Sequence, residues 1–160
     1  MKKKTYILGI GTVLLLVILF AVFESKSVSS FENIDNFDGN IQIYKSGSCG
    51  CCDVYSNYFK TKGNSNVEVV DLEDLDLIKQ QYNVPQQLES CHTTIVGDYF
   101  VEGHMPLEAV EKLLQEKPNI KGIALPGMPS GSPGMPGAKK GDFVVYAVNY
   151  DGSYEEFMRV

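Results

Sequence analysis

The sequence predicts an α/β domain, and three observations support this fold class. Short β-branched runs alternate with segments whose apolar residues recur at three- and four-residue spacing, the pattern of strands alternating with amphipathic helices. One strand-to-helix turn carries Cys49-Gly50-Cys51-Cys52, so three of the four cysteines fall within four residues. The 160 residues, 44% of them hydrophobic, suffice for one domain with a core but are too few for two.

The first segment predicts an export signal or a membrane anchor. Three lysines, Lys2 to Lys4, precede residues 6–23, which carry no charge, and a helix of that length just crosses a bilayer core of about 30 Å. No small-residue cleavage site follows, which favours an uncleaved anchor over a removed signal peptide. Because the lysines stay in the cytoplasm, we expect the rest of the chain on the extracytoplasmic, periplasmic side of the inner membrane.

Three parts are therefore expected: an anchor or signal segment at 1–24, a polar linker at 25–40, and a domain at 41–160. The linker is rich in Ser, Asn and Asp, and its few apolar side chains could pack along the domain. Three of the 14 basic residues precede the apolar run, whereas all 20 acidic residues follow it. The exported part is thus acidic, and we expect it to bind no nucleic acid.

The order of the predicted elements specifies the fold further. The apolar pattern predicts strands at 41–44 and 67–71, helices at 51–63 and 74–82, a β-hairpin at 93–96 and 99–102, and a helix that opens at Pro106. A C-x-x-C spacing, Cys49 to Cys52, follows the first strand. This order is that of a thioredoxin-like domain with a central mixed sheet and flanking helices.

Two segments lie beyond this pattern. Residues 124–141 are rich in proline and glycine, which support neither helix nor strand pairing, and they contain a near-repeat, Pro126-Gly127-Met128-Pro129 and Pro133-Gly134-Met135-Pro136. We call them the Pro/Gly/Met loop. Residues 143–149 and 154–158 flank a turn and predict a C-terminal β-hairpin. This hairpin is expected to extend the sheet at an edge or to cap the loop.

The clustered cysteines allow two chemistries, dithiol/disulfide exchange and the binding of a soft metal. A thiol at a helix N-terminus has a lowered pKa, which serves both. A plain structural disulfide is the least favoured alternative, because three cysteines around one glycine are poorly suited to a simple stabilising cross-link.

Other soft donors lie elsewhere in the chain. Cys91-His92 comes just before the third predicted strand, whose start should approach the cysteine turn. His104, taken alone, is interpreted as a helix cap or a surface residue. Met128 and Met135 have no core to fill, so we interpret them as thioether donors suited to Cu(I), with a flexible or partner-binding loop as the alternative. Because thioethers do not attract Zn²⁺, they favour copper over zinc.

These motifs resemble the CopG-type copper-resistance proteins, a family of exported thioredoxin-like metal-binding proteins. The resemblance covers residues 41–148. It rests on Cys49-Gly50-Cys51-Cys52, Val84-Pro85, Leu88, Ser90-Cys91-His92-Thr93, Val101-Glu102-Gly103-His104, Pro126-Gly127-Met128-Pro129 and Gly131-Ser132-Pro133-Gly134-Met135.

The resemblance implies copper handling outside the cytoplasm, with cysteines bridging several Cu(I) ions. Other exported copper-handling proteins are then expected partners. The sulfur ligands implied by position are Cys49, Cys51, Cys52 and Cys91, and the outer or terminal ligands are His92, His104, Met128 and Met135.

Whether the protein is an enzyme stays open at this point. A copper oxidoreductase is one alternative, because the resemblance raises redox interconversion of copper. A thiol/disulfide oxidoreductase, in which Cys49 attacks a substrate disulfide and Cys52 resolves it, is less favoured, because the adjacent Cys51 would compete for the mixed disulfide. A structural zinc site is a third alternative, and it would have no need of the methionines.

Overall fold

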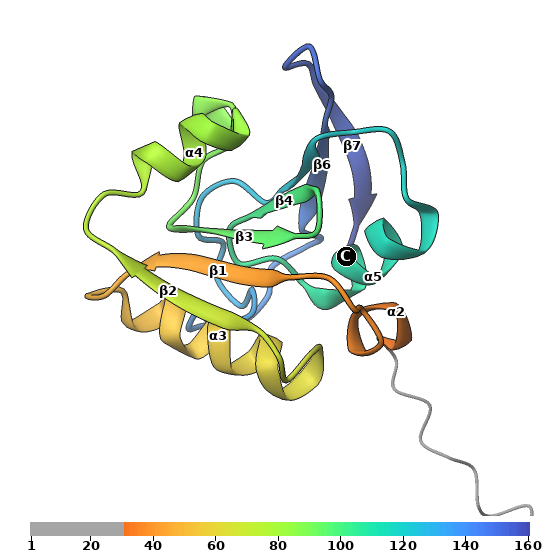
Figure 1. The fold of residues 1–160 in the computed structure, drawn as a ribbon. Coiled ribbons are helices and arrows are strands. Elements are labelled where there is room, and N and C mark those ends of the chain that lie inside the picture. The colour runs from red at the N-terminus through yellow and green to blue at the C-terminus, as the bar shows by residue number, and fades with distance from the viewer. Residues whose placement is uncertain (1–30) are drawn as a thin grey trace, which may run out of the picture. The chain divides into compact units, whose positions relative to one another are not determined.

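The structure is a computed structural model that describes residues 31–160 (Figure 1). The predicted anchor at 1–24 and the first part of the predicted linker lie outside these residues. Within residues 31–160, no helix combines the length and the apolar character needed to cross a membrane. The described chain forms one compact unit that begins at Phe31, so residues 31–40 of the predicted linker belong to the folded unit.

A seven-stranded mixed sheet runs through this unit in the order β2-β1-β3-β4-β5-β6-β7. β1 and β2 are parallel, as are β4 and β5, and the other neighbouring pairs are antiparallel. The strands are β1 (Ile41–Ser46), β2 (Glu68–Leu72), β3 (His92–Val96), β4 (Tyr99–Glu102), β5 (Gly122–Ala124), β6 (Val144–Val148) and β7 (Tyr154–Arg159). The predicted α/β class with a central mixed sheet is confirmed, and the finer thioredoxin-like assignment stays a prediction.

Helices supply the crossovers that the parallel pairs require. The helical elements are α2 (Glu32–Asp35), α3 (Gly50–Lys62), α4 (Asp76–Tyr82), α5 (Leu107–Glu116) and a short 3-10 helix (Gln86–Leu88). Helix α3 connects β1 to β2, and it ends where the Gly63 N–H donates to the Phe59 carbonyl, 2.8 Å away. Helix α5 connects β4 to β5 and follows Pro106, as the sequence predicts.

The two faces of the sheet are covered by different helices (Figure 1). Side chains of α3 and α5, including Tyr55, Phe59 and Leu113, belong to the larger core cluster. On the other face, Leu88 and Phe100 belong to a smaller cluster that forms near α4. Because both faces of the central strands are covered, every residue of β3 is buried.

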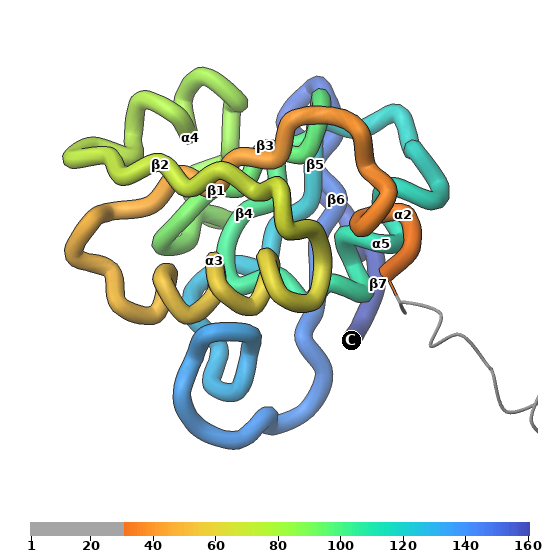
Figure 2. Tube along the Cα trace, turned by 60° about the horizontal axis from the view of Figure 1, so that its bottom comes forward, coloured from red at the N-terminus to blue at the C-terminus, as the bar shows by residue number. Residues whose placement is uncertain are grey.

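The C-terminal hairpin extends the sheet at its edge, which is one of the two predicted arrangements. β6 pairs with β5 and β7 pairs with β6, both antiparallel. The Pro/Gly/Met loop connects β5 to β6 and projects beside α3 (Figure 2). Strand β5 was not predicted, because its three residues are too few to show a period.

Helix α2 docks on α5 and is held at both ends. At its beginning, the Glu111 carboxylate accepts hydrogen bonds from the backbone N–H groups of Asn33 and Ile34, at 3.0 and 3.1 Å. At its end, the Asn64 amide donates to the Ile34 carbonyl at 2.8 Å. Ile34 itself is fully buried. These contacts make residues 31–40 an integral part of the fold.

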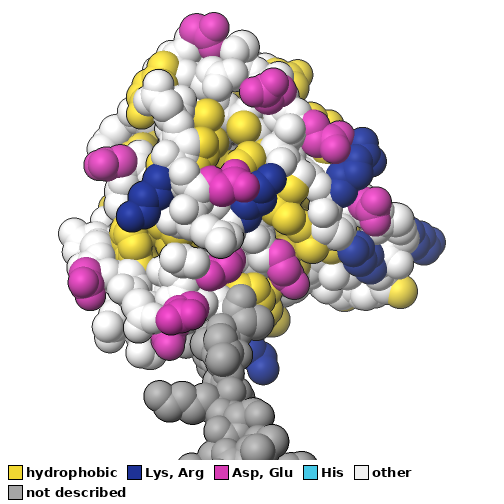
Figure 3. Space-filling view, turned by 90° about the vertical axis from the view of Figure 1, so that its right-hand side faces the viewer, with side chains coloured by type: hydrophobic (Ala, Val, Ile, Leu, Met, Phe, Trp, Pro, Cys, Tyr) yellow, Lys and Arg dark blue, Asp and Glu magenta, His cyan; other side chains and the backbone are white. Residues whose placement is uncertain are grey.

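Acidic and basic side chains are interspersed on the face that Figure 3 shows. Arg159 and Glu156 form a salt bridge of 2.7 Å on β7. Lys112 of α5 places its Nζ atom 4.4 Å from the centre of the Phe157 ring. The outer strand of the sheet is therefore an exposed, charged edge, which disfavours further strand pairing.

Candidate metal centre

The cysteine turn joins β1 to α3 and is fixed by backbone and ionic contacts. Cys49 has an extended backbone and caps α3, where its carbonyl accepts from the N–H groups of Cys52 and Asp53 at 3.1 and 3.2 Å. Lys45, the next-to-last residue of β1, is buried. It forms ion pairs with Asp53 at 2.8 Å and with Asp71 at 2.6 Å. Strand and helix are thus connected directly on either side of the sulfurs.

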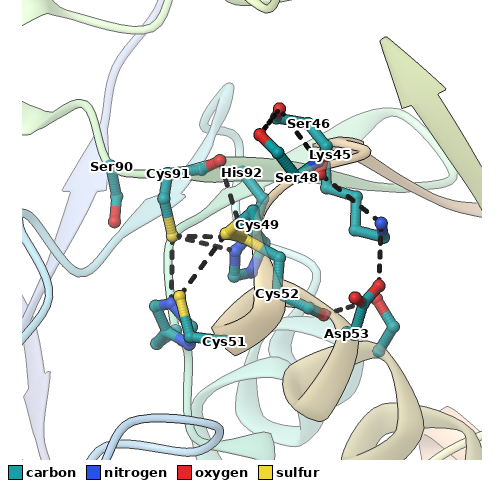
Figure 4. The surroundings of a disulfide bond; sticks show 12 residues. Lys45, Ser46, Ser48, Cys49, Cys51, Cys52, Asp53, Ser90, Cys91 and His92 are labelled. Carbon is teal, nitrogen blue, oxygen red and sulfur yellow. Dashed lines mark hydrogen bonds and ion pairs between the residues drawn. A yellow bond between two sulfur atoms is a disulfide. The ribbon is translucent and has the colours of Figure 1, made fainter.

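All four cysteine sulfurs meet at this turn (Figure 4). Cys49 and Cys52 form a disulfide, whereas Cys51 and Cys91 are free thiols. The Cys51 sulfur lies 3.4 Å from that of Cys49, and the Cys91 sulfur lies 3.5 Å from that of Cys52. Cys91 directly precedes β3, and the antiparallel pairing of β3 with β1 brings it to the turn. The four sulfurs lie within 4.8 Å of one another.

Two imidazoles extend the sulfur cluster into the protein. The Cys91 sulfur lies 3.4 Å from His92 Nδ1 and 2.9 Å from His104 Nε2. Both histidines are fully buried. The interpretation of His104 as a cap or surface residue is therefore wrong, because Gly103 turns the chain after β4 and directs the side chain inward. Cys52, Cys91, His92 and His104 form a second group of donors within 4.8 Å.

Burial sets the protonation of these donors. It raises the pKa of the Cys91 thiol to about 11, and the nearby Cys51 thiol acts in the same direction. Burial also lowers the pKa of His92 well below its ordinary value, with further contributions from His104 and Lys79. The pKa of His104 is lowered by burial too, against its hydrogen bond to the Pro133 carbonyl, which favours the charged form. At neutral pH the site thus offers neutral imidazoles and a protonated Cys91.

The second repeat of the Pro/Gly/Met loop contacts the site, whereas the first is more exposed. His104 Nδ1 donates to the Pro133 carbonyl at 2.7 Å. At Gly134, where φ is +83°, a Cβ would lie 2.8 Å from the Cys51 carbonyl. Met135 follows directly and is half-buried, while Met128 exposes 54% of its surface. Of the two methionines, Met135 is therefore the one whose backbone adjoins a contact with the site.

The donor set fits a soft metal ion. It consists of sulfur and neutral imidazole, which suit copper and zinc and do not suit Mg²⁺ or Ca²⁺. In the disulfide form, two of the four sulfurs are bonded to each other. Reduction of this disulfide by two electrons gives two more thiols when two protons are taken up, and all four cysteines must then lose their protons to bind a metal as thiolates.

One buried network beside the site was not predicted from the sequence. It centres on Glu102 and Lys79, which form an ion pair behind Cys91 and His92. The signal in the sequence is weak: an acidic residue ends an apolar strand, and a lysine lies in a short helix of mixed polar and apolar residues. Both patterns are usual for solvent-exposed positions.

Known proteins are similar to this chain. The model of a family described as "Protein of unknown function, DUF411" matches residues 88–135. No curated protein sequence matches. Two solved structures, titled copper resistance protein CopG form 1 and form 2, each share 31% identity and a TM-score of 0.69 with the chain. They cover 76% of it, which corresponds to 96% and 97% of their own length.

The chain belongs to the CopG copper-resistance family. The resemblance drawn from the sequence motifs is confirmed. The DUF411 match contains Cys91, His92, His104 and both loop methionines, while the cysteine turn precedes it. Membership of the CopG family and the Cys/His cluster together support a copper-related function for this protein.

Proposed function

We propose that this CopG relative binds copper outside the cytoplasm, as Cu(I) held by cysteines that bridge more than one ion. The observation that carries the proposal is the convergence of four cysteine sulfurs within 4.8 Å, overlapped by a second group that adds two imidazoles. Soft thiolates are donors that Cu(I) prefers. A thiolate sulfur has more than one lone pair, so it can bind two ions at once.

The proposed ligand set follows from the placement of each donor. Cys49, Cys51, Cys52 and Cys91 would supply the sulfurs once the disulfide is reduced. His92 and His104 adjoin the Cys91 sulfur and would bind as terminal ligands. Met135, beside the site, and Met128, on the exposed part of the loop, would act as outer thioether ligands.

The location and partners belong to the same proposal. The charge-free residues 6–23 after three lysines support an inner-membrane anchor with the domain on the periplasmic side. Other exported copper-handling proteins would then deliver or receive copper. Copper redox activity is part of the proposal as well, because the Cys49/Cys52 pair can hold or release two electrons.

Copper loading of the reduced full-length protein tests the proposal. The wild type should retain Cu(I) against a chelator, and a Cys49→Ser/Cys51→Ser/Cys52→Ser variant should retain none. X-ray absorption should show mainly sulfur ligation with short metal-metal distances. Equal copper retention by the two proteins would contradict the proposal. Preferential zinc retention that Met128→Ala and Met135→Ala leave unchanged would instead favour a structural zinc site.

A thiol/disulfide oxidoreductase is the second candidate, and the disulfide between Cys49 and Cys52 favours it. Cys49 caps α3, the position from which an attacking thiol gains from the helix dipole. The assay is insulin reduction by the copper-free protein. Rapid turnover that Cys49→Ser abolishes would support this activity, whereas turnover no faster than that of free thiol would exclude it.

A further inference from the structure

Glu102 is the most deeply buried acidic residue at the metal centre, and three donors converge on its carboxylate. The side chain has no exposed surface. It accepts hydrogen bonds from the Ser90 backbone N–H at 2.6 Å and from the Thr93 hydroxyl at 2.6 Å. The ammonium of Lys79, which is also buried, forms an ion pair with it and lies 3.3 Å from the Thr93 hydroxyl. The carboxylate is therefore fully engaged.

These contacts join the two segments that carry the inner donors of the site. Ser90 and Thr93 stand on either side of Cys91 and His92, so their bonds to Glu102 fix the backbone that carries both ligands. Glu102 itself is two residues before His104. The Gly103 N–H between them donates to the His92 carbonyl at 3.0 Å, which closes the connection. One carboxylate is thus bonded to both sides of the Cys91-His92 segment and lies two residues before His104.

Stability alone does not account for an ion pair at this place. Glu102 ends β4 and Lys79 lies in α4, and every residue of the neighbouring strand β3 is buried. Burial raises the pKa of Glu102, against the stabilising contacts with Lys79 and Thr93. Replacing a buried ion pair by apolar residues is often neutral or stabilising. The contacts of the carboxylate with the ligand-bearing backbone are what an apolar pair would not reproduce.

We propose that Glu102, neutralised by Lys79, is a positioning residue for the metal centre, which holds the Cys91-His92 segment and His104 in the arrangement that binds copper. This inference rests on the proposed copper function. It adds that two residues that do not bind the metal, Glu102 and Lys79, hold the ligands in place. Partners that orient metal ligands typically change metal affinity by about 10- to 100-fold when they are replaced.

Glu102→Gln, Lys79→Met and the double variant test the role in the full-length protein. A glutamine keeps the shape of the side chain but replaces one carboxylate oxygen by an NH2 group, so the Ser90 N–H and the Thr93 hydroxyl can no longer both donate to an oxygen of their own. It also removes the charge that pairs with the buried Lys79 ammonium. Glu102→Gln should bind Cu(I) about 10- to 100-fold more weakly in competition with a chelator. X-ray absorption should also show fewer nitrogen ligands. The double variant should regain thermal stability, because no charge is left unpaired, without regaining copper affinity.

Glu111→Gln is the matched control. Its carboxylate also accepts three hydrogen bonds, from the Asn33 backbone, the Asn33 amide and the Ile34 backbone, but it serves α2 and lies outside the donor groups. This variant should lose stability and keep the copper affinity and ligation of the wild type. If Glu102→Gln does not fold, Thr93→Val, which keeps both charges, should still lower copper affinity several-fold.

Three results would overturn the inference. One is wild-type affinity and ligation in Glu102→Gln, or in Thr93→Val where the first variant does not fold. Another is recovery of affinity in the double variant together with its stability. The third is a loss of affinity in Glu111→Gln equal to that in Glu102→Gln. Failure of the wild type to bind copper would instead contradict the proposed function itself, so the two failures are distinguishable.

Discussion

Cys51 is the cysteine that separates copper binding from disulfide exchange. Its sulfur is free and lies 3.4 Å from Cys49, while Cys49 and Cys52 are joined. Cys51→Ser leaves the C-x-x-C pair intact but removes one of four sulfurs. We expect Cu(I) retention against a chelator to fall at least about tenfold. Insulin reduction should be unchanged or faster.

Ser48→Ala is the control for Cys51→Ser, because Ser48 is exposed on the same turn and carries no sulfur. Copper retention should be that of the wild type in this variant. The copper-binding role of Cys51 would be contradicted if both variants retained copper equally.

Site residues that lie close together in the sequence were predictable, and those brought together only by the fold were harder to predict. Three cysteines in one turn are visible without a structure, and the antiparallel pairing of β3 with β1 explains why Cys91 joins them. Lys79 and Glu102 were not predictable. The sequence could not show that these two residues are buried. Strands β3 and β4 are covered on both faces, so they lack the apolar/polar alternation that usually indicates which strand residues face inward.

The Pro/Gly/Met loop allows a paired test with two glycines. Gly134 and Gly127 both have positive φ, at +83° and +70°. A Cβ at Gly134 would lie 2.8 Å from the Cys51 carbonyl and 2.9 Å from the Tyr55 nitrogen, whereas at Gly127 nothing lies within 4 Å. Gly127→Ala should cost about 1–2 kcal/mol in free energy of unfolding from the backbone alone.

Gly134→Ala should cost about 1–3 kcal/mol more, because the loop must also move away from α3. That movement would break the contact between Pro133 and His104, so copper affinity should fall as well. Urea unfolding and chelator competition on both variants measure the two effects. Equal losses in the two variants would show that the loop does not pack against the site as described.

At the level of helices and strands, long periodic segments were predicted and short ones were not. The helices at 51–63 and 74–82 match α3 and α4 within two residues at each end, and the 93–102 hairpin matches β3 and β4. Strand β5 and helix α2 have three and four residues, too few to show a period. Both exist because of tertiary partners: β5 pairs with β4 and β6, and α2 binds Glu111.

The stability of the whole molecule should depend on pH through its buried histidines. In the unfolded chain both imidazoles titrate near their ordinary pKa of 6.5, whereas burial lowers the pKa of His92 and His104 in the folded protein. Below about pH 6.5 the unfolded chain therefore binds more protons, and the free energy of unfolding falls as the pH falls. Each histidine contributes at most about 1.4 kcal/mol per pH unit.

Urea unfolding of the copper-free protein between about pH 7 and 5.5 measures this slope. The groups that face the two rings are Cys91 and Tyr55, with Lys79 behind His92. His104→Gln should reduce the slope in this window whatever its effect on the absolute stability. A slope that His104→Gln leaves unchanged would contradict the assignment.

Copper should stabilise the folded protein only when the disulfide is reduced. The donors come from the turn at Cys49–Cys52, from Cys91 and from His104, so the full set exists only after the sheet has formed. A ligand at a hundredfold excess over its Kd adds about 2.7 kcal/mol, which raises Tm by roughly 10 °C. Thermal unfolding with and without copper, in reduced and oxidised protein, should show this shift in the reduced form. An equal shift in oxidised protein would contradict the need for four thiols.

Helix α2 is placed to bear a pulling force applied at the N-terminal end of the domain. Its two attachments, Glu111 on α5 and Asn64 just beyond the C-terminal end of α3, lie away from the cysteine turn at the beginning of α3. A force pulling on the chain ahead of Phe31 would be borne by these hydrogen bonds and by the buried Ile34. Strand β1 would be loaded only after α2 had detached. Tension applied ahead of Phe31 would therefore reach the cysteine turn only after the contacts of α2 had broken.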